Sequence, residues 1–549
     1  MTKLIKPHIL QILFVLVLCL SLFLRFYKIN VNPPSLDWDE ASLGYNAYSI
    51  LKTGADEYGN KFPLSIRSFD DYKPAAYVYL DVPSVAVFGL NEFGTRFPSA
   101  FLGFLSVVVI YFLTKEIFAN LEKDKNKKLA IVAAFFFGVS PWALQFSRAA
   151  FEGNVGVFFF LLGFWLFLKA MKNPKLIFLS ALSFILSMYS YHSFRVVTPL
   201  FVFFGLLIYW KEIFASKKYY LVAAVLGLIL CLPIFLSFIG TGGSGSRLSM
   251  VSIFSDPNAL GNSVNELQYD KTHGDKLAVL FHNRRIVYAL ATAKSYFDQW
   301  NPDFLFFHGD GGRQHHAVDM GMLYLWDLPF ILLGIHAILN RRNKGTLLLL
   351  GLFLIAPIPS AVATGSPHPV RAIAMSPVFS IFAAAGIFFL ATSLTKFRKT
   401  LLLIIALLFI FNFVYYLHQY YVDTPIQYGD FWQYGNKQAV LEAKSLETKY
   451  QKIVFTYKYD QPYIYYLFYD KIDPTWYQKN WNYLGTGQVE RMHRIIGKYD
   501  FRNIDWGKDS QLKDALLIGT PDEIPANAKG LIDTIYFPNG NVAYRIVGT

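Results

Sequence analysis

The chain has 549 residues, of which 54% are hydrophobic and only 16% are charged, and its mean hydropathy is +0.33. A soluble domain carries roughly a quarter charged residues, so this composition excludes an ordinary water-soluble enzyme and a disordered chain. The formal net charge is +13, but the basic residues are dispersed over short loops without interleaved aromatic residues, which argues against nucleic-acid binding.

About eleven apolar segments follow one another along the chain, and most approach the roughly 20 residues that cross a bilayer. They lie near residues 8–25, 97–118, 129–147, 153–170, 175–192, 196–210, 218–239, 322–339, 345–362, 371–391 and 399–417. The first resembles a signal-peptide core, but no small-residue cleavage site follows it, so we interpret it as an uncleaved first span. The pattern predicts an α-helical, multi-pass membrane protein.

The charges of the short loops indicate the orientation of these spans. One alternating set of loops carries clusters of Lys and Arg near residues 123–128, 169–175, 211–218, 341–344 and 396–399. The opposite short loops hold little more than single arginines. Because basic loops stay in the cytoplasm, we predict a cytoplasmic N-terminus and, with an odd number of spans, an extracytoplasmic C-terminus.

Three segments are then expected on the outer side of the membrane. Two are loops, at about 26–96 and 240–321, the second with an interfacial helix near 276–297. The third is the tail at 418–549, where strands at 453–457 and 515–519 and a helix at 436–450 predict a small α/β domain. We therefore predict two domains, a transmembrane domain at 1–417 and an extracytoplasmic α/β domain at 418–549.

An acidic pair, Asp39 and Glu40, follows the first predicted span directly. A carboxylate at the water-facing edge of a membrane suits general-base chemistry, since partial desolvation favours proton uptake. The structural alternative is that Asp39 caps a helix that begins at Ala41, with Glu40 favourable near the helix dipole. The local pattern leaves both interpretations open.

The acidic pair belongs to a longer pattern that includes Lys73-Pro74 and the segment Arg96–Ala100 (RFPSA) at the start of the second span. In order, spacing and side of the membrane, this pattern over roughly residues 1–417 resembles the GT-C membrane glycosyltransferases. The resemblance is to the lipid-carrier-dependent group of protein O-mannosyltransferases and aminoarabinose transferases, glycosyltransferase families 39 and 83.

The resemblance implies roles for several of these residues. Asp39, beside Glu40, would be the base for an acceptor hydroxyl, and Lys73 would contact the donor phosphate. Two positions depart from the aminoarabinose transferases, since Ser42 stands where they usually have arginine and Tyr72 where they usually have an acid. These departures argue against aminoarabinose as the sugar and against a metal site copied from those enzymes.

Isolated arginines mark the outer ends of four spans. They are Arg96, Arg148, Arg195 and Arg371. Each alone could reach for lipid headgroups, whereas several around one cavity would bind a lipid phosphate through charge-assisted hydrogen bonds. Arg371 lies in the segment SPHPVR, which also holds His368 and resembles the Pro-His-x-x-Arg loop of many bacterial members of the family. We predict donor-phosphate contact for Arg96, His368 and Arg371.

Further polar residues are candidates for lining the substrate site, as are Arg148 and Arg195. The second outer loop contains HGDGGRQHH, which ends in His315 and His316. These residue types permit a divalent metal site, but a solvated Gly-rich turn or a substrate-lining loop fits the pattern as well, and no cofactor is implied. Glu152, which follows Arg148, is an outer-edge acid that could orient a substrate or pair with that arginine.

We therefore predict a glycosyltransferase that moves a sugar from a polyprenyl-phosphate donor to an acceptor hydroxyl outside the cytoplasm, with inversion. The acceptor is a protein, a glycan or a lipid, and the sequence does not choose among them. The alternative is a transporter or flippase of a lipid-linked saccharide. A transporter needs ionisable residues along its pathway, whereas here they gather at the ends of the spans.

Overall fold

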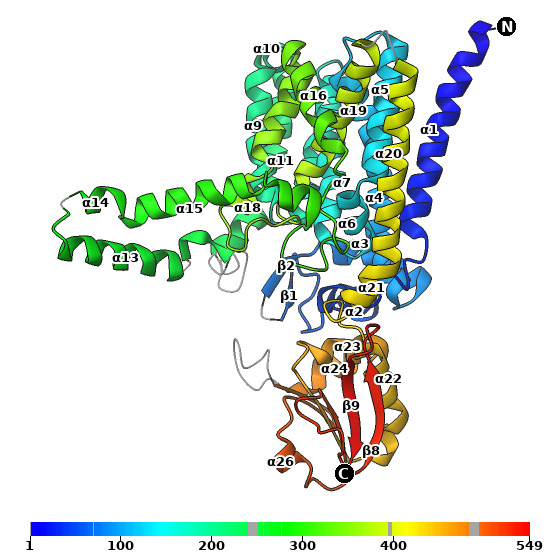
Figure 1. Ribbon diagram of the computed structural model, residues 1–549, viewed down its shortest axis with the longest axis vertical. Helices are drawn as coiled ribbons and strands as arrows, with labels where there is room; N and C mark the ends of the chain where they lie inside the picture. The colour runs from blue at the N-terminus through cyan, green and yellow to red at the C-terminus, as the bar shows by residue number, and fades with distance from the viewer. Residues whose placement is uncertain are drawn as a thin grey trace. The chain divides into compact units, whose positions relative to one another are not determined.

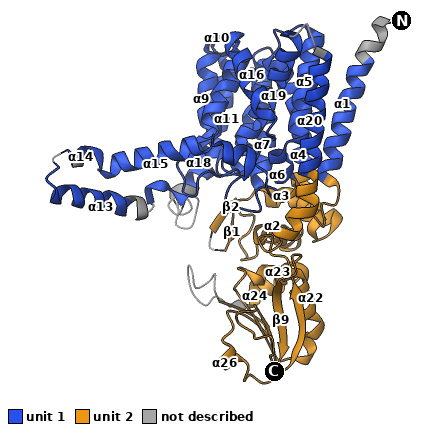
Figure 2. Cartoon of the chain, in the orientation of Figure 1, with its two compact units in different colours: residues 1–25, 101–147, 152–416 blue, residues 26–100, 148–151, 417–549 orange. Residues whose placement is uncertain are grey.

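The structure is a computed structural model that describes residues 2–69, 71–239, 251–255, 257–275, 277–393, 398–482 and 493–549. The beginning of the second predicted outer loop, residues 240–250, lies outside the described residues. The chain forms two compact units, coloured in Figure 2. Unit 1 comprises residues 1–25, 101–147 and 152–416, and unit 2 comprises residues 26–100, 148–151 and 417–549.

Long apolar helices make up most of unit 1 (Figure 1). The helices that lie wholly or largely in it are α1 (Thr2–Phe26), α4 (Glu92–Ile117), α5 (Lys123–Val139), α6 (Pro141–Arg148), α7 (Glu152–Ala170), α8 (Ile177–Ser190), α9 (Phe194–Ile208), α10 (Trp210–Ala215), α11 (Lys217–Ile239), α13 (Pro257–Thr272), α14 (Ala278–Phe281), α15 (Arg284–Asp298), α16 (Asp327–Asn340), α17 (Lys344–Ile355), α18 (Ile358–Ala361), α19 (Ser376–Ser393) and α20 (Arg398–His418).

Each predicted span has a helix in its place. Within the described residues, seven helices are long and apolar enough to cross a membrane, and the pair α5 and α6, bent by 54°, is an eighth if counted as one span. The bend falls at Pro141, which cannot continue the hydrogen-bond ladder of α5. The predicted spans at 175–192, 196–210 and 322–339 correspond to the shorter apolar helices α8, α9 and α16. The chain is thus a multi-pass membrane protein, and the count of eleven spans stays a prediction.

Unit 2 combines the first predicted outer loop with the tail. The loop contains α2 (Trp38–Thr53), β1 (Ser65–Ser68), β2 (Asp71–Pro74) and α3 (Ala76–Phe88). The tail contains α21 (Thr424–Gln427), α22 (Asn436–Leu446), β3 (Lys452–Phe455), α23 (Pro462–Tyr469), α24 (Pro474–Asn480), β4 (Trp481–Asn482), β5 (Arg494–Ile496), β6 (Tyr499–Phe501), α26 (Trp506–Asp509), β7 (Ala515–Gly519), β8 (Leu531–Tyr536) and β9 (Val542–Gly548).

The tail folds around a seven-stranded sheet in the order β4-β5-β6-β3-β7-β9-β8. Strand β3 runs parallel to β6 and β7, and the remaining pairs are antiparallel. Its core includes Val454, Leu517 and Val547, which are fully buried. The predicted strands at 453–457 and 515–519 and the helix at 436–450 are confirmed as β3, β7 and α22.

The first outer loop packs with the tail inside unit 2. The Tyr45 hydroxyl of α2 donates to the carbonyl of Ile472 (3.1 Å), and Gln478 donates to Ser49 (3.1 Å) and to the carbonyl of Asp56 (2.8 Å). The sequence assigned this loop to the same domain as the spans, whereas its contacts group it with the tail.

Within unit 1, α16 and α19 approach each other more closely than side chains would allow. A Cβ atom at Gly334 of α16 would overlap the carbonyl oxygen of Phe382, and one at Gly386 of α19 would overlap that of Phe330. Small residues at helix crossings permit such backbone contact in membranes. The two glycines therefore set the spacing of this helix pair.

We expect Gly334→Ala to destabilise the protein by about 1–3 kcal/mol, the usual cost of overpacking, and to lower its thermal unfolding midpoint in detergent. Gly227→Ala in α11 is the matched control, because a Cβ there meets its nearest neighbour, the Ile185 side chain, at 3.9 Å. Equal midpoints for the two variants would contradict the proposed role of the close crossing.

Candidate functional site

Helix α2 begins at Trp38 and is capped by Asp37. The Asp37 side chain accepts a hydrogen bond from the Glu40 backbone amide (2.8 Å), and the Glu40 carboxylate accepts one from the Asp37 amide (3.3 Å). This reciprocal arrangement is a capping box. The alternative that Asp39 caps a helix beginning at Ala41 is therefore wrong, and Asp39 lies in the first turn with no capping role.

The three acids of this turn have different surroundings. Burial, together with the neighbouring carboxylates of Glu40 and Asp39, raises the pKa of Asp37 well above its usual range, because each of these effects disfavours a further negative charge. Asp39 and Glu40 each have a cationic partner of their own.

Glu40 is paired with Arg96, and both side chains are almost completely buried. The guanidinium donates to both carboxylate oxygens of Glu40, through Nε (2.9 Å) and Nη2 (2.8 Å). Its other acceptors are the backbone carbonyls of Ile29, Pro33 and Ser35. A guanidinium has five N–H donors, and these bonds use all five. They favour a structural role for Arg96 and Glu40, and the donor contact of Arg96 and the catalytic role of Glu40 stay predictions.

Asp39 is paired with Lys73 of β2, with 2.5 Å between Oδ1 and Nζ. The Asp39 side chain is 50% exposed, whereas that of Lys73 is only 7% exposed. The ammonium also lies 5.5 Å from the centre of the Phe69 ring. The arrangement presents one half-exposed carboxylate beside a buried cation, which suits proton transfer next to a bound anion.

Arg148, the other predicted arginine in unit 2, is held by the chain itself. It donates to the carbonyls of Tyr27 (2.8 Å) and Asn32 (2.9 Å) and to the Tyr420 hydroxyl (2.9 Å). Its guanidinium also lies 5.1 Å from the centre of the Tyr420 ring. These contacts favour an anchoring role for Arg148, and its contact with substrate stays a prediction.

Two further predicted arginines, Arg195 and Arg371, line one cavity of about 450 Å³ within unit 1. Arg195 donates to the carbonyl of Met188 (3.2 Å) and Arg371 to that of Thr364 (2.5 Å). Most other lining residues are apolar. The lining residues come from α8, α9 and residues 191–193 between them, from α11, and from the segments 251–252 and 359–363. The cavity thus combines two permanent cations with an apolar wall, a combination that suits a phosphate attached to a lipid chain.

Two histidines of the second outer loop, His315 and His316, are buried, so the interpretation as a solvated Gly-rich turn does not hold for them. His315 is 7% and His316 is 5% exposed, and His315 Nδ1 lies 2.8 Å from the Asp310 carboxylate. A Cβ atom at Gly312 would overlap the His315 ring. A Cβ atom at Gly309 would likewise overlap the His316 ring, so these two glycines permit close packing over the histidine rings.

His368 lies near this loop, with its ring centre 5.1 Å from that of His315. Glu152 is the half-buried first residue of α7. Within the described ranges, no group of three or more His, Cys, Asp or Glu side chains is placed to hold a metal ion.

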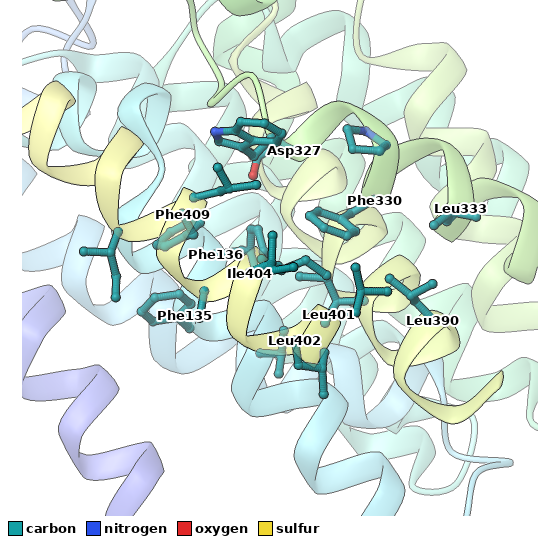
Figure 3. A pocket seen from close by; sticks show the side chains of 18 residues that line it. Phe135, Phe136, Asp327, Phe330, Leu333, Leu390, Leu401, Leu402, Ile404 and Phe409 are labelled. Atoms are coloured by element: carbon teal, nitrogen blue, oxygen red, sulfur yellow. The ribbon is translucent and has the colours of Figure 1, made fainter. Parts of the chain in front are cut away.

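A second cavity of unit 1, of about 630 Å³, has a different character (Figure 3). Its walls are apolar side chains of α5, α16, α19 and α20, such as Phe136, Phe330 and Phe409, and Asp327 is the one ionisable residue among the described residues that line it. The cavity with Arg195 and Arg371 is therefore the better candidate for an anionic lipid.

We expect Glu40→Gln to destabilise the protein by about 3–5 kcal/mol, since removing one partner of a buried ion pair leaves the other charge uncompensated. The matched control is Glu122→Gln, whose partner Lys125 and own side chain are more than half exposed. It should leave the unfolding midpoint close to that of the parent protein, because exposed ion pairs contribute little to stability. Thermal unfolding in detergent measures the stability of both variants. Equal midpoints for Glu40→Gln and Glu122→Gln would contradict the structural role of Glu40.

Comparison with known proteins gives partial sequence matches. Residues 73–236 match the model of a family described as dolichyl-phosphate-mannose-protein mannosyltransferase. The "Putative mannosyltransferase YkcB" of Bacillus subtilis (strain 168) is 28% identical over 189 residues, which are 33% of this chain and 24% of that protein. The match thus spans about a quarter of the length of this curated relative.

Two solved structures share the fold over nearly the whole chain. ArnT from Cupriavidus metallidurans bound to undecaprenyl phosphate has a TM-score of 0.52 at 12% identity, covering 97% of each chain. The Archaeoglobus fulgidus oligosaccharyltransferase tethered to an acceptor peptide has a TM-score of 0.52 at 12% identity, covering 98% of this chain and 74% of that one. The predicted resemblance is confirmed: the chain has the GT-C glycosyltransferase fold, and residues 73–236 match the dolichyl-phosphate-mannose-protein mannosyltransferase family.

Proposed function

We propose that the chain is a glycosyltransferase that moves a sugar from a polyprenyl-phosphate donor to an acceptor hydroxyl. The observation that carries this proposal is the pair of Asp39 and Lys73, a half-exposed carboxylate 2.5 Å from a buried ammonium. The matched family is described by its dolichyl-phosphate-mannose substrate, and one solved structure with this fold is bound to undecaprenyl phosphate. Both descriptions support a lipid phosphate as the carrier.

Asp39 is the proposed base because the neighbouring acids have other roles. Asp37 caps α2, and Glu40 is bound to Arg96. Asp39 is also the acid of the turn that points toward solvent, with half of its side chain exposed, so an acceptor hydroxyl can reach it. Lys73 holds the carboxylate in place until substrate arrives.

The proposed reaction is a single displacement. The acceptor hydroxyl gives its proton to Asp39 while its oxygen forms a bond to the anomeric carbon of the sugar. The bond between that carbon and the phosphate oxygen breaks, and the phosphate keeps the electron pair. Lys73 stabilises the resulting charge, and as it turns to the phosphate it frees Asp39 to accept the proton. One displacement at the anomeric carbon inverts its configuration.

The loop charges support a site on the extracytoplasmic side of the membrane. The basic loops favour a cytoplasmic N-terminus, so that the first outer loop, the second outer loop and the tail face away from the cytoplasm. A polyprenyl carrier suits this side, since it presents its sugar at the membrane surface. The proposal does not specify the sugar, and the acceptor is a protein, a glycan or a lipid.

The cavity with Arg195 and Arg371 is the proposed site for the lipid phosphate in unit 1. Its apolar walls fit the first part of a polyprenyl chain, and its two guanidinium groups fit the phosphate. Arginine binds phosphate with two parallel hydrogen bonds, which lysine cannot reproduce.

We expect Arg371→Gln to weaken binding of polyprenyl phosphate about 10- to 150-fold, which corresponds to the loss of one charge-assisted interaction of about 1.5–3 kcal/mol. Arg371→Lys should restore only part of the affinity. Native mass spectrometry of the purified protein with added polyprenyl phosphate measures the binding. The control is Arg342→Gln on an exposed loop, and equal affinities for the two glutamine variants would remove Arg371 from the site.

We expect Asp39→Asn to reduce sugar transfer by about 10²–10⁴-fold, the usual contribution of a positioned general base. Folding should be retained, because Asp37 and not Asp39 caps the helix. Asp71→Asn is the matched control, since it makes the same change in the same loop and should leave transfer near the parent level. Near-normal transfer by Asp39→Asn on a donor that the parent enzyme uses would disprove the assignment of the base.

A further inference from the structure

Helix α15 has two faces with different surroundings. At 100° per residue, Ile286, Leu290 and Phe297 fall on one face, and these side chains are 38%, 64% and 68% exposed. Ser295 lies on the opposite face and is buried, and Gln299, directly after the helix, is also buried. A soluble helix would turn its apolar stripe inward, whereas α15 turns it away from the unit it belongs to.

The inner face of α15 holds the segment that carries Arg371. Gln299 donates to the Ser366 hydroxyl (2.5 Å), and that hydroxyl donates to the carbonyl of Ser295 (2.9 Å). The His368 amide donates to the Gln299 side-chain oxygen (3.3 Å). Three hydrogen bonds thus fix residues 366–368, a few positions before Arg371.

Helix α15 belongs to a helical hairpin formed by α13, α14 and α15. The base of this hairpin forms part of the cavity wall. Residues just before α13 pair with the segment that follows α18: Thr364 donates to the carbonyl of Val251 (2.8 Å), and Ser252 and Ala363 form an antiparallel bridge. Val251, Ser252 and Ala363 line the cavity with Arg371, and Arg371 itself donates to the Thr364 carbonyl. Both ends of the hairpin are therefore tied to the cavity.

The rest of the hairpin reaches away from the helix bundle of unit 1. Figure 1 shows α13, α14 and α15 extending sideways, across the direction of α9 and α19. Four apolar side chains at its tip are more than half exposed. They are Leu277, Val279, Leu280 and Phe281.

Basic residues flank the apolar surface of the hairpin. Arg284 and Arg285 follow two residues after the tip. Arg285 and Lys294 lie on either side of the stripe formed by Ile286, Leu290 and Phe297, and Lys294, which is 77% exposed, also pairs with Asp298 (2.7 Å). Long basic side chains beside an exposed apolar stripe are typical of helices that lie in a bilayer surface, where the cations reach the anionic headgroups. The charge pattern therefore favours a lipid surface as the partner.

We propose that the α13–α15 hairpin lies on the bilayer surface, with the stripe on α15 and the apolar tip in the boundary between headgroups and hydrocarbon. Because the inner face of α15 holds residues 366–368, this contact also positions the Arg371 loop at the cavity. The membrane contact stands by itself, whereas its effect on donor binding rests on the proposed function.

The membrane contact is tested with spin labels on single cysteines, in a variant that lacks Cys19 and Cys231, reconstituted into vesicles of phosphatidylethanolamine and phosphatidylglycerol. A label at position 290 should be more accessible to oxygen than to a water-soluble nickel complex. A label at Asn265, a polar and exposed position on α13, should show the reverse. Equal access of the nickel complex to both positions would overturn the proposal. Dipolar broadening at position 290 that grows with protein concentration would also overturn it, because it would indicate a second copy of the chain as the partner.

The coupling between the membrane contact and the cavity is tested by the affinity of the protein, in the same vesicles, for polyprenyl phosphate. Leu290→Asp, which places a charge on the stripe, should weaken binding about 5-fold or more, and Asn265→Asp should not. Ser366→Ala should weaken binding without changing the accessibility at position 290. Unchanged affinity in both Leu290→Asp and Ser366→Ala would overturn the coupling. Failure of the parent protein to bind polyprenyl phosphate would instead count against the proposed function, and the membrane contact would still stand.

Discussion

The buried ion pair of Glu40 and Arg96 is the interaction on which the candidate site depends. Arg96 lies in the first turns of α4 and binds both oxygens of Glu40 and three carbonyls of residues 29–35, and Glu40 also accepts the Ala150 amide (2.8 Å). The Arg96 guanidinium and the Glu40 carboxylate together thus fix the turn after α1, the start of α2 and residue 150. Because Glu40 is immobilised, its neighbour Asp39 is presented to solvent at a defined place.

The two units contribute different chemistry. Unit 2 supplies a carboxylate and an ammonium within 2.5 Å of each other, which suits proton removal beside a developing negative charge. Unit 1 supplies an apolar cavity with two guanidinium groups, which suits a lipid anion. In the sequence the ionisable residues gather near the ends of the predicted spans, and this distribution favours chemistry at the membrane surface over passage of a substrate through the bundle.

The sequence predicted what depends on local pattern and missed what depends on distant partners. Apolar runs placed a helix at every predicted span, and strand propensities placed β3 and β7. The capping box of Asp37 and Glu40 was visible as an acid three residues before a glutamate, yet the helix start was expected three residues later. The pairing of Glu40 with Arg96, 56 residues apart, and the burial of His315 under a Gly-rich loop follow from tertiary packing, which no local pattern encodes.

The central claim is that the chain cleaves a lipid-linked sugar, and the most direct measurement is release of the carrier. The purified full-length protein in vesicles would be incubated with a panel of polyprenyl-phosphate sugars, and free polyprenyl phosphate would be followed by mass spectrometry together with the transferred sugar. The account predicts release of polyprenyl phosphate from at least one donor, in equal amount to the sugar transferred. Movement of an intact lipid-linked sugar across the bilayer, with no donor of the panel cleaved, would contradict it and indicate a transporter.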